Sequence, residues 1–349
     1  MITEKPVCVT GASGFIAAHI IRELLAQGYS VRGTVRKSPK NYPFLLGLPG
    51  AAEHLELIEA DLLVNGSYDC AIAGCDYVMH TASPYKNKVK KPQIDLVDPA
   101  VNGTETVLES CLKAGTIKRV ILTSSIAAIT DEPDSMKEFT EKDWNTMSSL
   151  DRNPYHYSKT LAERAAWDFI MRKRPKFDLI VLNPFMVIGP SLGPSLNTTN
   201  EMIRDIICGV YPGIIDMNWG FVDVRDVAKA HILAMETETA SGRYLCSAEI
   251  MHMKTLVALL KSSGFDHYPL PKINLSGKSG TLLMKVLSFT QPWDIGVYIR
   301  TNIGRTMRYD NAKIKRELGI SFKPAKESII EAVKDMVQWG HLPPLKNVK

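Results

Sequence analysis

Short apolar runs alternate with longer segments of helical periodicity over the first half of the chain. From Phe15 to Gln27, apolar residues recur at three- and four-residue spacing, and Gly28 then ends the predicted helix. Similar helical patterns cover Val101–Ala114 and Tyr155–Arg172. The strand-like runs are Val7–Thr10, Ser30–Val35, Leu55–Ile58, Tyr77–His80, Arg119–Thr123 and Leu179–Leu182. This alternation predicts an α/β protein in which a doubly wound parallel sheet carries helices on both faces.

After Pro184 the pattern becomes less regular, beginning with a Pro-, Gly- and Ser-rich loop from Pro190 to Thr199. The helical patterns that follow are Glu201–Cys208, Val224–Met235, Lys254–Ser262 and Glu327–Trp339. No segment has the composition of a clean linker, so the two parts should share one cleft. We predict a first domain over residues 1–183 and a smaller α/β part over 184–349, with 221–235 returning to the first domain.

Composition excludes several classes of protein. The 349 residues are 45% hydrophobic and 23% charged, and the 42 basic and 37 acidic residues leave a net charge of +5. This charge is too small and too scattered to indicate nucleic-acid binding. The six cysteines include no CxxC pair or zinc-ligand spacing, so we expect no metal. No signal-peptide layout and no apolar stretch of about 20 residues is present, which predicts a cytoplasmic protein without membrane contact. Either a monomer or a homodimer is compatible with the sequence.

A glycine-rich turn lies between the first predicted strand and helix. Gly11, Gly14 and Ala17 form a GxxGxxA pattern. Gly11 allows a tight turn, Gly14 lets the backbone approach a pyrophosphate, and the small Ala17 lets the helix pack closely on the sheet. The free N–H groups and the dipole of the helix then favour an anion. The pattern indicates a dinucleotide site, although a plain glycine-rich turn would also fit.

The end of the second predicted strand favours NADP(H) over NAD(H). NAD-binding folds usually place an acidic residue there for the ribose hydroxyls, whereas this chain has Val35 followed by Arg36 and Lys37. A guanidinium can hold a 2′-phosphate through paired hydrogen bonds, which a carboxylate would repel. The alternative is a pair of solvated loop cations.

The segment NPYHYSK at residues 153–159 has the spacing of an acid–base site. Asn153 can cap a helix and Pro154 suits its first position. Tyr155 and Lys159 are then one turn apart on the same face, and the ammonium lowers the pKa of the phenol by favouring the phenolate. Such a phenol can exchange a proton with a substrate oxygen. An ordinary amphipathic helix would also explain the spacing.

Two serines end the strand-like run Arg119–Thr123. A hydroxyl at the carboxyl end of a parallel strand lies where open α/β sheets bind ligands, so Ser124 or Ser125 could hold a carbonyl oxygen. Serine is also common as a simple turn residue, which leaves that alternative open.

The ordered motifs resemble the extended short-chain dehydrogenases/reductases. They are VTGASGFIA (9–17), GTVRK (33–37), EADL (59–62), HTASP (80–84), VNGT (101–104), LTSSIAA (122–128), YHYSKTLAERAAW (155–167), NPFMVIGP (183–190) and FVDVRDVAKAH (221–231). More narrowly, the chain is similar to the dihydroflavonol reductase-like branch, which includes cinnamoyl-CoA reductases and yeast-type methylglyoxal and ketone reductases. Two segments differ from plant dihydroflavonol reductases: residues 276–308 are longer and residues 129–152 are short.

The resemblance implies a Rossmann-type NADP(H)-binding domain over residues 1–183 and a mainly substrate-binding part over 184–349. It makes Tyr155 the acid/base, Lys159 the residue that binds the nicotinamide ribose and tunes Tyr155, and Ser125 the catalytic serine. The other implied cofactor contacts are Gly11, Ser13, Gly14, Phe15, Ile16, Arg36, Lys37, Asp61, Leu62, Thr81, Ala82, Ser83, Pro184 and Val187. Asp61 would contact the adenine amino group, although a strand-end turn would also explain it. We interpret His80 as a buried core histidine, and Asp223 and Asp226 as helix-capping residues.

The implied reaction is the reversible, NADPH-dependent reduction of an aldehyde or ketone to an alcohol. The expected substrate contacts are Tyr85, Ile126, Met186 and Phe221, with Ser83, Pro84 and Val187 beside them and Met217 and Trp219 as weaker candidates. Their apolar and aromatic character suits an aryl or alkyl carbonyl compound. Two kinds of alternative remain: an NAD-dependent sugar epimerase or 3β-hydroxysteroid dehydrogenase on the same fold, and a non-enzymatic NADP(H)-sensing protein.

Overall fold

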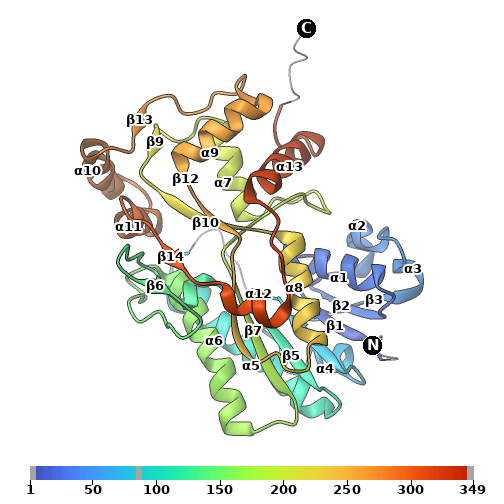
Figure 1. Ribbon diagram of the computed structural model, residues 1–349. Coiled ribbons are helices and arrows are strands. Elements are labelled where there is room, and N and C mark those ends of the chain that lie inside the picture. The colour runs from blue at the N-terminus through green and yellow to red at the C-terminus, as the bar shows by residue number, and fades with distance from the viewer. Residues whose placement is uncertain (1–4, 84–88, 344–349) are drawn as a thin grey trace.

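A seven-stranded sheet forms the centre of the molecule in the computed structural model, which describes residues 5–83 and 89–343 (Figure 1). In spatial order its strands are β11 (Gly242–Cys246), β7 (Asp178–Pro184), β5 (Arg119–Thr123), β4 (Tyr77–His80), β1 (Val7–Thr10), β2 (Val31–Val35) and β3 (Leu55–Glu59). All neighbouring strands pair in parallel. The strand order reverses direction between β1 and β4, the kind of switch point at which such sheets bind ligands. The predicted Rossmann-type parallel sheet is confirmed.

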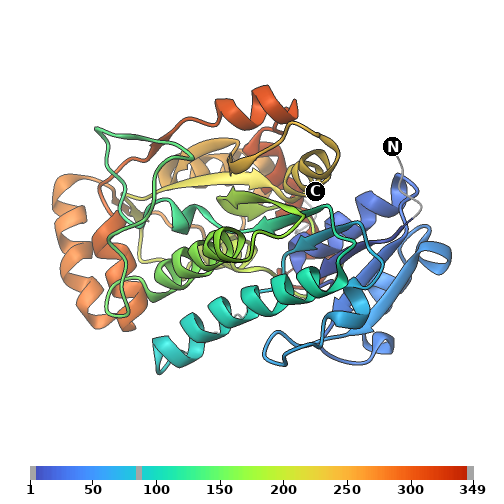
Figure 2. The same ribbon diagram turned by 90° about the horizontal axis from the view of Figure 1, so that it is seen from below.

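Alternate residues of the central strands enter two separate hydrophobic clusters. Val7 and Val9 pack in one cluster with α1 (Phe15–Ala26) and α8 (Val224–Glu236). Cys8, between them, packs in the other cluster with α5 (Asp98–Ala114) and α6 (Pro154–Lys173). Figure 2 shows α5 and α6 running side by side along the sheet. Because successive side chains of a strand point to opposite faces, the two clusters show that helices cover both faces.

The sequence predicted the start of most elements of this sheet to within one residue. Gly28 has a φ of 82° just beyond α1, which is the left-handed conformation expected of a helix-ending glycine. β11 was not predicted. Its pairing with β7 brings residues from the far half of the chain into the central sheet.

Three smaller sheets and several helices make up the rest of the molecule. The sheets are β12 (Glu249–His252), β10 (Asn218–Asp223) and β8 (Met186–Ile188); β13 (Asn274–Leu275) and β9 (Ile214–Ile215); and β14 (Arg308–Tyr309) and β6 (Glu138–Phe139). The helices are α2 (Pro43–Leu46), α3 (Ala51–His54), α4 (Asp69–Ile72), α7 (Thr198–Ile207), α9 (Met253–Leu260), α10 (Lys278–Leu287), α11 (Trp293–Asn302), α12 (Ala312–Leu318) and α13 (Ala325–Gln338). A separate hydrophobic cluster joins α7, α9, α13 and β10.

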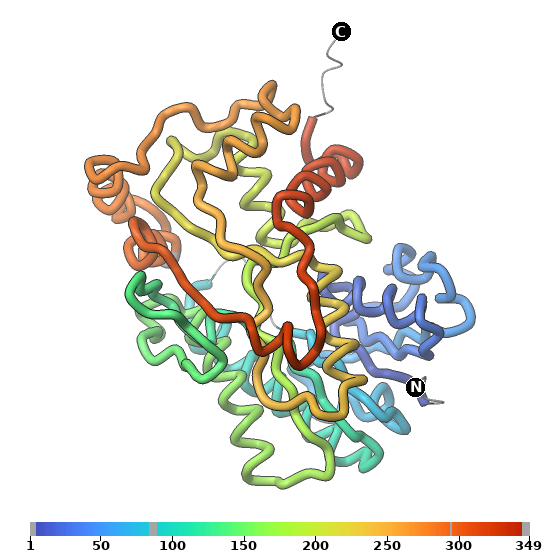
Figure 3. The backbone as a smooth tube through the Cα atoms, viewed as in Figure 1, coloured from blue at the N-terminus to red at the C-terminus, as the bar shows by residue number. Residues whose placement is uncertain are grey.

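The C-terminal half contributes to both parts of the molecule. After α11 the chain passes through β14 to α12, and then turns back to α13 (Figure 3). Ile314 and Leu318 of α12 pack in the same cluster as α1 and α8, so this helix belongs to the core of the central sheet. The β14–β6 pair joins the segment 276–308 to the segment 129–152, the two regions whose lengths the sequence analysis singled out.

Candidate active site

The glycine turn places the start of α1 against the end of β4. Gly11 has a φ of 68°, and a Cβ there would lie 3.0 Å from the Cα of Ala82. The amide of Gly14 donates to the carbonyl oxygen of Gly11 over 2.8 Å, and α1 begins at the next residue. The first N–H groups of a helix have no partner within the helix, so they are available to an anion. The turn therefore fits the pyrophosphate of a dinucleotide.

Thr10 organises the backbone beside this turn. Its Oγ1 accepts hydrogen bonds from the amides of Thr81 and Ala82, and the Thr81 hydroxyl donates to the Thr10 carbonyl oxygen. The Thr10 Oγ1 is also hydrogen-bonded to Nδ1 of His80 over 2.8 Å. Burial lowers the pKa of His80 to about 3, so this ring stays neutral and structural, as predicted.

The charged residues that were assigned to the adenosine part of the cofactor lie at one edge of the sheet. Arg36 and Lys37 directly follow β2 and are exposed. Asp61 follows the neighbouring strand β3 and is also exposed. Its Oδ1 accepts from the amide of Leu63 over 2.9 Å, so the carboxylate does stabilise a turn. Its contact with adenine stays a prediction.

The helix α6 begins at Pro154 and carries Tyr155 and Lys159 on its first two turns. Asn153 precedes it with a φ of 49°, and its side chain makes no capping bond. The prediction of a side-chain cap is wrong, because the Asn153 amide donates instead to Asp131 and Thr301. Tertiary partners on two other segments thus fix the approach to the helix.

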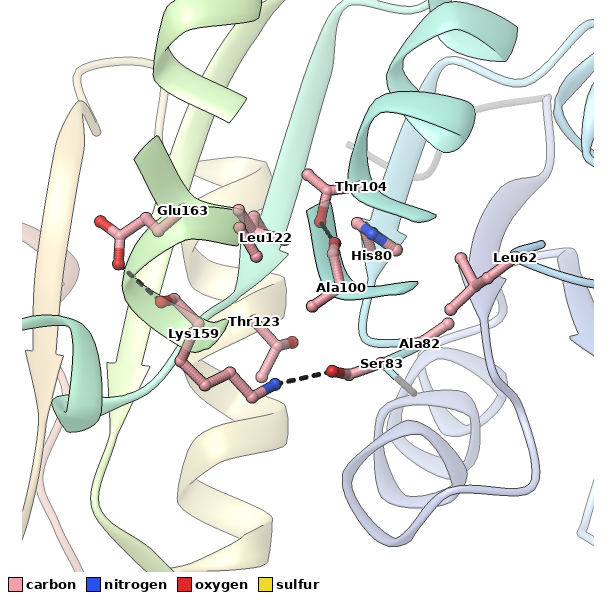
Figure 4. Close-up of a pocket in the computed structure, with 12 residues that line it drawn as sticks. Leu62, His80, Ala82, Ser83, Ala100, Thr104, Leu122, Thr123, Lys159 and Glu163 are labelled. Atoms are coloured by element: carbon pink, nitrogen blue, oxygen red, sulfur yellow. Dashed lines mark hydrogen bonds between the residues drawn. The ribbon is translucent and has the colours of Figure 1, made fainter. Parts of the chain in front are cut away.

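Tyr155 and Lys159 lie close together, and Lys159 lines a pocket. Tyr155 is 40% exposed, and the Nζ of Lys159 lies 5.9 Å from the centre of the Tyr155 ring. Figure 4 shows the Lys159 side chain extending from α6 toward Ser83, to whose Oγ it donates over 2.9 Å. Desolvation lowers the pKa of Lys159 to about 8. The expected proximity of an amine and a phenol is therefore present.

The two serines that follow β5 have different environments. Ser124 is buried, and its hydroxyl donates to Oε2 of Glu163 over 2.6 Å. Ser125 is half-buried, and its Oγ accepts from the amide of Ala127 over 3.2 Å. The Ser124 proton is therefore held by an internal carboxylate, and the role of Ser125 as a donor to a bound molecule stays a prediction.

The pocket lies between the ends of β4 and β5 and the helices α5 and α6 (Figure 4). It is lined by Leu62, His80, Ala82, Ser83, Ala100, Thr104, Leu122, Thr123, Ser124, Lys159, Ala162 and Glu163. It brings together four predicted cofactor contacts from distant parts of the chain, namely Leu62, Ala82, Ser83 and Lys159. Sequence reasoning missed Glu163, although it lies in the motif that contains Tyr155 and Lys159.

The predicted substrate contacts differ in how accessible they are in the structure. Ile126 and Met186 are half-buried. Phe221 is fully buried in the cluster formed with α7, α9 and α13, which corrects its assignment to the pocket wall. The weaker candidates Met217 and Trp219 are buried in that cluster as well. The predicted contact Tyr85 and its neighbour Pro84 lie outside the described residues. Pro184 and Val187 are both buried where β7 leads into β8, and their cofactor contact stays a prediction.

Two further properties concern only residues 5–83 and 89–343. No group of three or more His, Cys, Asp or Glu side chains within these ranges is arranged to hold a metal ion. Every helix in the same ranges is too short or too polar to span a bilayer.

The chain is similar to several known proteins over most of its length. The model of the NAD dependent epimerase/dehydratase family matches residues 7–246. Cinnamoyl-CoA reductase CAD2 of Medicago truncatula is 45% identical over 267 residues, or 73% of this chain and 79% of the relative. Cinnamoyl-CoA reductase 1 of Petunia hybrida is 39% identical over 349 residues, or 98% of this chain and 95% of the relative. The crystal structure of Gre2 from Candida albicans with NADPH has a TM-score of 0.81 at 32% identity, covering 96% of this chain and 99% of that one.

Proposed function

On the premise that this chain belongs to the NAD dependent epimerase/dehydratase family, within the extended short-chain dehydrogenases/reductases, we propose that it reduces an aldehyde or ketone through Ser125, Tyr155 and Lys159. At the general level the chain is an NADP-dependent oxidoreductase, and its cofactor is NADP(H). The finer proposal concerns the roles of the three side chains and the class of carbonyl substrate.

One observation carries the proposal. Tyr155 is a surface-accessible phenol, and one helical turn away lies the desolvated amine of Lys159, which lines a pocket at the carboxyl ends of two parallel strands. A cation held near a phenol favours the phenolate and so eases the loss of the phenolic proton.

Each of the three residues has a distinct task. NADPH, when bound, supplies the hydride. Ser125 donates a hydrogen bond to the substrate oxygen, since its own oxygen already accepts from the amide of Ala127. Tyr155 gives its proton to the same oxygen as negative charge develops there. A donor preset toward that charge costs no rearrangement during the reaction. Lys159 stabilises the phenolate that remains.

An aryl or alkyl carbonyl compound is the substrate class that we propose. Ile126 and Met186 are apolar and partly accessible, and they lie on the segments that follow β5 and β7. Two relatives are named cinnamoyl-CoA reductases, which supports an aryl-substituted carbonyl compound. The NADP(H) cofactor disfavours an NAD-dependent epimerase.

The proposed acid/base is tested by Tyr155→Phe, which keeps the ring and removes the hydroxyl. We expect turnover of NADPH with aryl aldehydes, methylglyoxal or a dihydroflavonol to fall by about 10²- to 10⁴-fold, since that is the usual contribution of a general acid. NADPH binding, followed by its fluorescence, should stay near the wild-type value. Tyr157→Phe, two residues along the same helix, is the matched control and should keep full activity. Activity retained in Tyr155→Phe would overturn the proposal.

A further inference from the structure

Glu163 is a buried carboxylate that the reaction outlined above does not use. It lies one helical turn beyond Lys159 on α6 and is only 1% exposed. Its Oε2 accepts from the hydroxyl of Ser124 over 2.6 Å and from the amide of Asn183 over 2.8 Å. A buried carboxylate is costly unless donors surround it, so this arrangement needs an explanation.

Arg243 holds this carboxylate from the other side. The arginine is on β11 and is 7% exposed, and its Nε donates to Oε1 of Glu163 over 2.6 Å. Its Nη1 donates to the carbonyl oxygens of Glu141 and Asp143, and its guanidinium lies 4.0 Å from the centre of the Trp144 ring. Because its N–H groups are hydrogen-bonded and its plane lies against the Trp144 ring, the guanidinium has little freedom to move.

The same carboxylate is linked to the backbone of Ser125 by one intermediate residue. The Asn183 amide that donates to Glu163 also donates to the carbonyl oxygen of Ser125 over 3.1 Å. Ser125 has an extended backbone, with φ −160° and ψ 158°. Neighbouring side chains in an extended segment point in opposite directions, so holding Ser124 against Glu163 turns Ser125 the other way.

We propose that Glu163 is a positioning residue, which with Ser124 and Asn183 fixes the orientation of Ser125 relative to Tyr155. Arg243 anchors the carboxylate in this role. The inference rests on the proposed function, because it concerns the orientation of the hydroxyl group of the catalytic serine. It also explains why only one of the two serines can donate to the substrate oxygen: the hydroxyl of Ser124 is bonded to Glu163 and helps to position Ser125.

The test compares Glu163→Gln in the wild type and in a Ser125→Ala background. The glutamine keeps the shape of the side chain, but an amide nitrogen in place of Oε2 would face the amide donor of Asn183. We expect kcat to fall by roughly tenfold to a hundredfold, since small misplacements of reacting groups have effects of this size. The KM for NADPH should not change. In the Ser125→Ala background the same substitution should cost almost nothing, because the residue acts through Ser125.

Ser124→Ala provides a second route, since it removes one bond to Glu163 without leaving a buried charge unpaired. It too should lower kcat in the wild type and have little effect in Ser125→Ala. Trp167→Phe is the matched control: it removes the 3.3 Å bond from Trp167 to Oε1, on the side away from the serines, and should leave kcat unchanged.

The outcomes separate the two proposals. If Ser125→Ala keeps full activity, the proposed function fails whatever Glu163 does. If Ser125→Ala is inactive or slow, but Glu163→Gln and Ser124→Ala keep wild-type kcat, only the positioning role fails. The role is also overturned if the losses from Glu163→Gln and Ser125→Ala multiply in the double variant, because the two residues would then act independently.

Discussion

Two arginines on strands of the central sheet each pair with a carboxylate, one near each end of the sheet. At the amino end, Arg119 of β5 makes two hydrogen bonds of 2.8 Å to the carboxylate of Asp178 on β7. Toward the carboxyl end, Arg243 of β11 bonds to Glu163 of α6. Both guanidiniums are mostly buried, and both also donate to backbone carbonyl oxygens.

The partner carboxylates differ more than the arginines do. The Asp178 side chain is 53% exposed, whereas that of Glu163 is fully buried and shares its oxygens with Ser124 and Asn183. Arg119 thus attaches the end of α8 and the loop that follows it to the sheet. The pair at the carboxyl end is connected to the site. Both pairs join a guanidinium to a carboxylate, so this interaction alone does not distinguish them. The difference lies in the other hydrogen-bond donors that contact the carboxylate.

The largest expected effect is a loss of stability when the Arg119–Asp178 pair at the amino end is broken. Arg119→Ala leaves several backbone carbonyl oxygens without their donor, and we expect it to lower the free energy of unfolding by about 3 kcal/mol. Its kcat should match that of the wild type, because Arg119 and Asp178 lie at the first positions of their strands, whereas the described pocket lies at the carboxyl ends. Urea unfolding and steady-state kinetics on the same preparation check both statements. A loss of kcat as large as that of Glu163→Gln would contradict the contrast between the two ends.

Acidification should lower the stability of the protein through two buried histidines near the carboxyl end of the sheet. Burial lowers the pKa of His80 to about 3 and that of His231, which is hydrogen-bonded to Thr123, to about 4. Between these values and about 6.5 the unfolded chain binds protons that the folded chain does not, so stability falls as pH falls. Each such histidine should cost about 1.4 kcal/mol between pH 7.5 and 5.5.

The contribution of one histidine is measured by difference. His231→Gln should lose stability less steeply over this pH range than the wild type does, by about 1.4 kcal/mol. Arg119→Ala should be less stable at every pH but should keep the wild-type slope. If His231→Gln kept that slope as well, the pKa of His231 would be the same in the folded and unfolded chains, and its burial would not contribute to the loss of stability.

Most of the central sheet could be predicted from the sequence because its strands are short, mainly apolar or β-branched runs that alternate with helical patterns. β11 could not, since its place depends on pairing with β7, which lies far away in the chain. The misassignment of Phe221 has a similar cause. In β10, five successive residues are buried, so no alternation of exposed and buried positions indicates which face meets a pocket.

The candidate site was predictable where its chemistry is local. The spacing of Tyr155 and Lys159 along one helix places them together whatever the rest of the chain does. The choice between Ser124 and Ser125 is different, because it depends on Glu163, a carboxylate 39 positions beyond Ser124. Likewise, local propensity suggested that the Asn153 side chain caps α6, but partners on other segments hold it instead. Interactions of this kind become visible only when the fold brings the segments together.

The smallest expected effect concerns Arg36, an exposed cation at the carboxyl end of a strand, whereas Arg243 is buried and hydrogen-bonded. It is exposed just beyond β2, where the 2′-phosphate of NADPH is predicted to bind. Arg36→Ser should raise the KM for NADPH about tenfold, the value of one charge-assisted hydrogen bond, and leave the KM for NADH unchanged. Lys40→Ser, an exposed cation four residues on, is the control and should leave both values near wild type. Equal losses in the two variants would mean that general attraction by positive charge, rather than a specific contact with Arg36, sets the preference.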